Sequence, residues 1–239
     1  MNRTARVRVD AAAPTAAGRT SLSEQAYVAI KQLILRGDIK GGERVTEGML
    51  CERLSLGRNP VHIAVHRLHR EGLVEIVPRK NILVRGETIQ SFIELWNARL
   101  LVEPYLTELA AARADEHLVD ELRGLLAVGR KRHRAGDRRG CMEIDRAVHQ
   151  RVYEASGNRL LAEFASVLLD RSMRLWFAPF AGRYEEDDKT MDELAALIEA
   201  IEAREPVAAR RLMTEHIGSL RAHFARLQQG IDTPGTCPP

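Results

Sequence analysis

Three side chains with metal-binding chemistry stand out in the second half of the sequence: Asp145, His149 and His216. Asp145 and His149 are four residues apart in a segment with helical periodicity, so their side chains lie on one face of a helix. His216 lies among apolar neighbours in the last predicted helix, which favours an inward-pointing ring. One carboxylate and two imidazoles can hold zinc or nickel with a coordination position left open. The same three groups can also form a buried hydrogen-bonded cluster without a metal, and the sequence leaves both interpretations open.

A second set of polar residues follows Gly57, where a recognition helix is predicted. Such a helix offers its N-terminal turn and one polar face to the major groove of DNA. An arginine there can pair with guanine, whereas an asparagine can read adenine or cap the helix. Arg67 and Arg70 suit phosphate contacts or solvated charges. The alternative for the whole segment is a winged helix that binds a protein. The outer face carries Arg58, Asn59, His62, His66, Arg67 and Arg70.

Three histidines on this helix, His62, His66 and His69, have a spacing that could gather a metal ion. No fourth ligand accompanies them, and the end of the helix is open. We therefore expect a solvated or DNA-facing trio rather than a metal site.

The charge of the chain is unevenly distributed. Residues 1–86 hold 15 Lys and Arg against 8 Asp and Glu, whereas residues 87–239 hold 21 against 25. A basic first half on a mildly acidic second half indicates that the first half meets a polyanion.

The elements that must position the polar helix form a helix-turn-helix pattern. Ser21 or Ser23 caps a first helix that Gly37 ends, and Thr46 caps a second helix that runs to about Leu54. Asn59 as N-cap and Pro60 as first residue begin the third helix. Two short apolar runs, 73–77 and 82–84, then form a hairpin, which completes a winged helix-turn-helix.

The second half shows six helical patterns and no convincing strand, so we predict an antiparallel all-helical bundle and a mainly α protein. The domains are a disordered basic arm (1–19), the winged helix-turn-helix (20–86), a helical effector-binding and dimerisation domain (87–228) and a flexible tail (229–239). The six helices are expected at 88–113, 115–135, 138–155, 158–182, 186–204 and 206–228.

Composition excludes several classes of protein. No stretch of the 239 residues approaches the roughly 18 apolar residues of a membrane span, and no secretory signal pattern follows the N-terminus. The 3 cysteines are widely separated, which argues against a disulfide framework and against a cysteine-rich zinc site. We expect a cytoplasmic protein with no membrane partner.

Residues 22–84 resemble the winged helix of GntR-family transcription regulators. The resemblance implies binding to double-stranded DNA. One winged helix presents a small surface and pairing doubles the contacts, so we expect a homodimer that reads a palindromic operator. His62 stands where the family has a second arginine, and the wing has Arg79 but carries Asn81 where glycine is common. The matching residues are Arg58, Pro60, Val61, Ala64, Arg67, Leu68, Glu71, Gly72, Leu73 and Val74.

Residues 92–223 resemble the ligand-sensing domain of the FadR branch of that family, in its shorter, VanR-like form with six helices. Many relatives bind a divalent metal through one aspartate and three histidines, which implies Asp145, His149 and His216 here, with Leu194 in place of the middle histidine. The resemblance also assigns an acidic effector to Arg99, for which an ion pair with Glu103 is the alternative. The marks are Arg99, Glu103, Ala110 to Ala112, Asp145, His149, Ser156 to Asn158, Ala200, Ile201, His216 and Ile217.

The leading interpretation is a DNA-binding transcriptional regulator, not an enzyme, that acts as a repressor released by a small carboxylate metabolite. The effector site comprises Arg99, Asp145, His149, Asn158 and His216, with a helix N-cap as the alternative role of Asn158. One competing function is a helical metal hydrolase with Glu193 as base. The other is an architectural protein that binds DNA without sequence preference.

Overall fold

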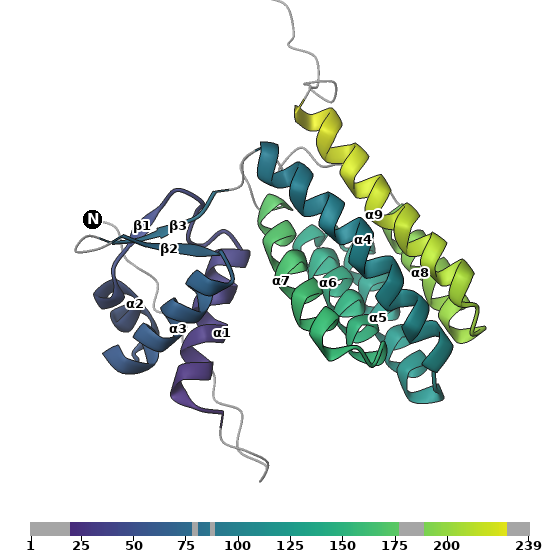
Figure 1. The fold of residues 1–239 in the computed structure, drawn as a ribbon, viewed down its shortest axis with the longest axis horizontal. Helices are drawn as coiled ribbons and strands as arrows, with labels where there is room; N and C mark the ends of the chain where they lie inside the picture. The colour runs from purple at the N-terminus through teal and green to yellow at the C-terminus, as the bar shows by residue number, and fades with distance from the viewer. Residues whose placement is uncertain (1–19, 78–80, 87–88, 177–188, 229–239) are drawn as a thin grey trace, which may run out of the picture. The chain divides into compact units, whose positions relative to one another are not determined.

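The computed structural model describes residues 20–77, 81–86, 89–176 and 189–228 (Figure 1). The chain divides into two compact units, with the boundary between Glu87 and Thr88. Helices dominate both units, which confirms the predicted mainly α class. None of the described helices is long and apolar enough to cross a lipid bilayer.

The first unit is a winged helix-turn-helix. Its three-stranded antiparallel sheet has the order β1-β3-β2, with Arg44 opposite Leu83 and Val74 opposite Val84. The sequence predicted the β2–β3 hairpin but not β1, because a strand of two residues shows no alternation. The elements are α1 (Leu22–Leu35), β1 (Arg44–Val45), α2 (Glu47–Leu54), α3 (Arg58–Arg70), β2 (Val74–Val77) and β3 (Asn81–Val84).

Two of the predicted helix starts are confirmed and one is wrong. Ser21 caps α1 by accepting from the backbone N–H of Glu24, and Thr46 caps α2. In contrast, α3 begins at Arg58 with Gly57 as N-cap, so Asn59 is the second helical residue and not the cap. Pro60 is tolerated inside the first turn because the N–H groups there have no acceptor within the helix.

Apolar spacing along α3 explains its orientation within this unit. Val61, Ala64, Val65 and Leu68 are buried, and α3 packs against α1, whose Ile30 is also buried. The opposite side of α3 is exposed. The helix therefore presents its polar side chains to solvent on a rigid support.

The second unit is a bundle of helices, as predicted. The prediction for the fourth helix ran to residue 182, whereas the described part of α7 ends at Trp176 and residues 177–188 lie outside the described structure. The described helices are α4 (Ile89–Arg113), α5 (Glu116–Arg134), α6 (Arg138–Ala155), α7 (Arg159–Trp176), α8 (Lys189–Glu202) and α9 (Pro206–Gln228).

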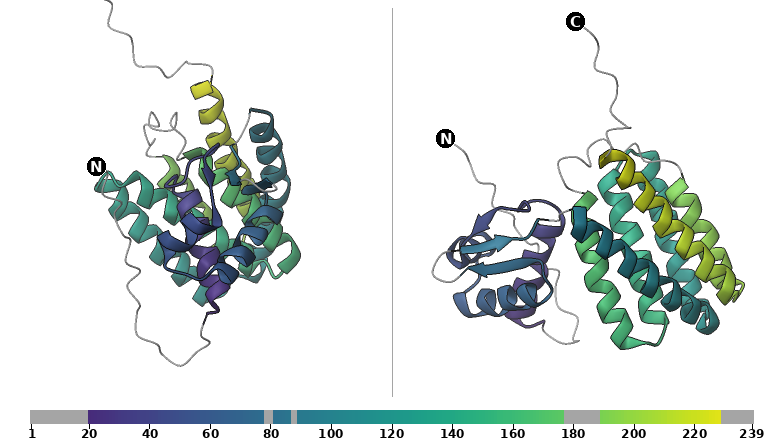
Figure 2. Two further views of the ribbon diagram at one scale, coloured as in Figure 1. Left: turned by 90° about the vertical axis from the view of Figure 1, so that its left-hand side faces the viewer. Right: turned by 45° about the horizontal axis from the view of Figure 1, so that its top comes forward.

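Helices α4 and α9 lie side by side along one face of the bundle, as the views of Figures 1 and 2 agree. The indole N–H of the buried Trp96 on α4 donates to the carbonyl oxygen of Ile217 on α9 at 3.0 Å. Val102 and Leu106 of α4 pack with Tyr153 of α6 in a common core. This packing brings polar residues of α4, α6 and α9 to the centre of the bundle.

Candidate functional site

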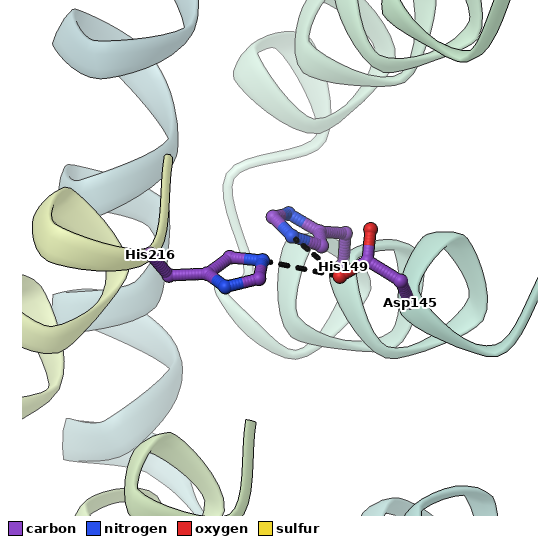
Figure 3. Close-up of side chains that lie close together, drawn as sticks. All are labelled: Asp145, His149 and His216. Carbon is purple, nitrogen blue, oxygen red and sulfur yellow. Dashed lines mark hydrogen bonds and ion pairs between the residues drawn. The ribbon is translucent and has the colours of Figure 1, made fainter. Parts of the chain in front are cut away.

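The structure brings Asp145, His149 and His216 together in the bundle (Figure 3). Asp145 and His149 come from α6, and His216 reaches them from α9. All three are buried, and one ligand atom from each lies within 4.8 Å of the other two. The Oδ1 atom of Asp145 is 3.1 Å from Nε2 of His216 and 3.8 Å from Nε2 of His149.

A carboxylate lies behind each of the two imidazole rings. Glu193 of α8 places Oε2 at 2.8 Å from Nδ1 of His216, and Glu103 of α4 places Oε2 at 2.9 Å from Nδ1 of His149. Because an ionised carboxylate only accepts hydrogen bonds, each of these contacts favours a proton on Nδ1. Both Nε2 atoms are then the ones that point toward Asp145.

The Nε2 atom of His149 is buried without a hydrogen-bond partner in the described structure. Buried polar atoms are nearly always satisfied, so an orphan in a cluster of ligand-type residues needs an explanation. An imidazole nitrogen with a free lone pair is a metal ligand. The donor set therefore fits a divalent cation held by Asp145, His149 and His216.

Arg99 is buried inside the bundle and donates three hydrogen bonds to its neighbours. Its Nε donates to Oε1 of Glu103 at 2.5 Å, and its Nη2 donates to Oε2 of the same carboxylate at 3.2 Å. Its Nη1 donates to Ser172 of α7 at 3.0 Å. The ion pair with Glu103 that the sequence offered as an alternative is therefore present, and the contact with an acidic effector stays a prediction.

The electrostatics of the cluster follow from burial opposed by close pairing. Burial disfavours a charged His216, yet hydrogen bonds to Asp145 and Glu193 raise its pKa to about 9. Burial likewise disfavours a charged Glu103, yet Arg99 and His149 lower its pKa to about 2. The pKa of Asp145 is also lowered, because His149 and His216 outweigh its burial. Without a metal, the site is a compact network of ions.

Leu194, where relatives imply a further histidine, is fully buried on α8 and offers no ligand atom. The neighbouring Glu193 contacts Nδ1 of His216 and the hydroxyl of Ser219. Its carboxylate is bound on the side of the ring remote from Nε2. That placement does not suit the role of a hydrolytic base beside the three ligands.

Asn158 occupies the N-terminus of α7. Its Oδ1 accepts from the backbone N–H of Leu161 at 3.2 Å, and its carbonyl accepts from Ala162 at 2.9 Å. These bonds are those of a helix N-cap, the alternative role stated from the sequence.

The predicted DNA-reading residues of α3 have different surroundings. Arg58, Asn59, His62 and His66 are exposed, and the Nδ1 of His62 lies 2.8 Å from a carboxylate oxygen of Glu47. The rings of His62 and His66 touch edge to face, with centroids 4.5 Å apart. These residues form one exposed polar face that begins at the N-terminus of α3.

Two residues of α3 are directed elsewhere. The guanidinium of Arg67 lies 3.5 Å from the ring centroid of Tyr27 and pairs with Glu24 at 2.7 Å, so it links α3 to α1. His69 is hydrogen-bonded to the carbonyl of Val74 at 3.0 Å, apart from the other two histidines. Arg79, predicted in the wing, lies outside the described residues.

Sequence reasoning missed the partners that surround the cluster. The contact between Glu103 and His149 joins two helices and leaves no trace in spacing. Tyr153, whose hydroxyl is 3.2 Å from Nδ1 of His149, could have been found, because Asp145, His149 and Tyr153 follow one another at steps of four on α6.

Comparison with known families divides the chain in the same way as the structure. Residues 22–84 match the family of bacterial regulatory proteins of the gntR type, and residues 94–219 match the FCD domain. The second match alone covers more than half of the chain. It includes every residue of the buried cluster.

Two of the similar proteins are named as transcriptional repressors. The chain is 26% identical to the HTH-type transcriptional repressor GlaR of Escherichia coli, over 83% of this chain and 93% of that protein. It is 27% identical to the transcriptional repressor NanR of Cronobacter sakazakii, over 88% of both chains. The fold is similar to that of E. coli McbR/YncC, with a TM-score of 0.80, 21% identity, and coverage of 89% of this chain and 100% of that chain.

Proposed function

The chain belongs to the GntR family of bacterial regulatory proteins, and from that premise we propose that it is a repressor controlled by a small carboxylate metabolite. One observation carries the proposal. A buried ionic cluster with an unpartnered ligand nitrogen lies in the helical unit that follows the winged helix. Such a cluster serves no evident purpose in a protein that only binds DNA.

We propose that Asp145, His149 and His216 hold one zinc or nickel ion. Three protein ligands leave coordination positions open, which distinguishes this site from a closed structural one. When bound, the ion supplies positive charge and a Lewis-acidic position for an effector carboxylate. Leu194 provides no fourth ligand, so the affinity is expected to be lower than in relatives with four.

The effector class follows from the charge of the cluster. Arg99 and the three candidate metal ligands are buried, and a carboxylate there would form charge-assisted bonds that water weakens elsewhere. Arg99 has already committed donors to Glu103, so the effector must use its remaining N–H groups or displace that pair. A small anion can bind the metal and also compete with Glu103 for Arg99, which a neutral sugar does less well.

The exposed face of α3 is the proposed DNA-reading surface. Arg58 at the first helical position would pair with guanine, and Asn59, His62 and His66 would contact neighbouring bases or phosphates. The basic balance of the first half of the chain would favour association with the phosphate backbone.

We also propose that the protein is a homodimer that reads a palindromic site. Leu101 and Tyr105 on α4 and Leu160 and Phe164 on α7 are large apolar side chains exposed to solvent. Their neighbours Val102 and Leu106 share a core cluster with Leu161 and Ala165, so α4 and α7 pack against each other. A second copy of the chain would cover this apolar surface.

Sedimentation velocity tests the dimer. Leu101→Lys with Phe164→Lys should produce a monomer, whereas Val207→Lys, an equally exposed apolar residue on α9, should remain dimeric. A wild-type protein that is monomeric at concentrations that bind DNA would contradict the proposal.

The mechanism is thermodynamic linkage. An effector that prefers one arrangement of the bundle shifts the population of DNA-binding dimers, and DNA weakens effector binding by the same factor. Fluorescence anisotropy with upstream and scrambled DNA tests the proposal, with zinc-loaded protein and a panel of small carboxylates. We expect selective binding to upstream DNA and release by one carboxylate. Equal affinity for both DNAs would instead favour an architectural protein.

A further inference from the structure

We propose that Glu103 is a positioning residue that fixes which nitrogen of His149 faces Asp145 and His216. The inference rests on the proposed metal role of the cluster and deepens it. It concerns a carboxylate that lies outside the three-residue set and contacts His149.

The ring of His149 has two nitrogens, and a neutral imidazole carries a proton on only one of them. Oε2 of Glu103 lies 2.9 Å from Nδ1 and can only accept. A proton on Nδ1 makes this contact a hydrogen bond, whereas a bare Nδ1 would set a lone pair against a negative oxygen. Glu103 therefore leaves the lone pair on Nε2, the orphan atom that faces the cluster.

Arg99 stabilises the charged form of Glu103 in the core of the bundle. Glu103 is 0% exposed, and a buried carboxylate without a partner would take up a proton and lose its role as acceptor. Arg99 occupies both oxygens of Glu103, and Ser172 holds the guanidinium in place. The carboxylate of Glu103 is therefore held in place by Arg99 of α4, which is itself held by Ser172 of α7.

Glu193 provides an internal comparison. It contacts Nδ1 of His216 at 2.8 Å, but its side chain is 25% exposed, and it also accepts a hydrogen bond from the hydroxyl of Ser219. Solvent can replace part of what Glu193 does, whereas bulk solvent does not contact the buried Glu103. We expect the loss of Glu103 to have the larger effect on metal affinity.

Calorimetric titration of zinc into chelator-treated protein provides the first test. Glu103→Gln keeps the size of the side chain and removes the charge, and should weaken zinc binding about 10- to 100-fold. The matched control is Glu108→Gln on the same helix, because Glu108 pairs with Arg210 away from the cluster. A Glu103→Gln protein that binds zinc as tightly as the control would overturn the proposal.

Nitrogen NMR of the imidazole in the metal-free protein, at a pH where the ring is neutral, provides a readout that does not depend on zinc. Wild type should show His149 with the proton on Nδ1, and Glu103→Gln should move the proton to Nε2. If wild type already carries it on Nε2, the proposal is wrong. If wild type has the Nδ1 proton but binds no zinc, the positioning role is supported and only the proposed metal is lost.

Glu103→Gln leaves Arg99 as a buried unpaired cation, which threatens folding. The double variant Arg99→Gln with Glu103→Gln removes both charges and is read in the same two assays. It should lose zinc affinity and the Nδ1 proton like the single variant. Wild-type behaviour of the double variant in both assays would overturn the proposal.

Discussion

The exposed face of α3 and the buried cluster of the helical unit use the same kinds of residue in opposite ways. On α3, His62 contacts Glu47 at 2.8 Å with both side chains in solvent. In the bundle, His216 contacts Glu193 at the same 2.8 Å with the imidazole fully buried. Exposed pairs contribute about 0–1 kcal/mol and exchange readily with other partners, whereas a pair with a buried member costs more to break. The two contacts have the same length, so it is burial that decides their role. An exposed pair can open to bind a ligand, whereas a buried pair holds its imidazole in a fixed orientation.

The two arginines, Arg58 and Arg99, show the same contrast. Arg58 is exposed at the start of α3 and is available for DNA. Arg99 is 1% exposed and donates hydrogen bonds to Glu103 and Ser172. Substitutions of these two residues should therefore affect different properties of the protein.

The largest expected effect is on folding. Arg99→Met leaves Glu103 buried without its cation and should lower the free energy of unfolding by about 3–5 kcal/mol. Arg210→Met removes an exposed partner of Glu108 and should lower it by less than about 1 kcal/mol. Urea denaturation measures both, and equal losses would contradict the contrast between buried and exposed pairs.

Metal affinity should depend strongly on pH. Because the pKa of His216 is raised to about 9, its Nε2 is protonated below that pH and a metal must displace the proton. Affinity for zinc should rise about tenfold per pH unit well below the pKa and level off near it, or roughly 50-fold from about pH 7 to about pH 9. Competition with a chelator measures it. Glu193→Gln should shift the rise to lower pH, and a flat profile in wild type would contradict the protonated state of His216.

Arg58→Ala should affect recognition without affecting folding. We expect a loss of about 1–3 kcal/mol in discrimination at one base pair, with an unchanged melting temperature. Arg70→Ala is the control, because a phosphate contact or a solvated charge should alter specific and non-specific binding alike. Anisotropy with operator variants measures the difference, and an Arg58→Ala protein as selective as wild type would show that α3 docks in another way.

The smallest expected effect concerns position 194, where the family resemblance implies a histidine and this chain has leucine. Leu194→His adds a ligand-type side chain on α8 and should tighten zinc binding by about tenfold, which corresponds to roughly 1.4 kcal/mol. Leu194→Met, of similar volume, is the control. No gain in calorimetry would show that position 194 does not face the metal.

Much of the fold was predictable because it depends on local signals. Helical periodicity and the caps at Ser21 and Thr46 identified the helices. The start of α3 was misplaced because asparagine before proline is a strong capping signal. Glycine is a weaker signal, yet Gly57 is the residue with the extended backbone of an N-cap. Strand β1 was missed because its two residues acquire their conformation from pairing with β3.

The candidate site was predictable only in part. Asp145 and His149 share one helix, so spacing alone placed them together. The connection of His149 to Glu103, and of that carboxylate to Ser172, depends on how α4, α6 and α7 pack, and no spacing encodes it. Arg67 shows the same limit, because its stacking on Tyr27 follows from the packing of α1 on α3.

The most direct test of the account is operator binding by His149→Gln, measured by anisotropy as the releasing carboxylate is titrated in the presence of zinc. We propose that the exposed face of α3 reads DNA and that the buried cluster senses the effector. We therefore predict that His149→Gln binds the operator as tightly as wild type but is not released by the carboxylate. Release of His149→Gln at the same carboxylate concentration as wild type would contradict the assignment of sensing to this cluster.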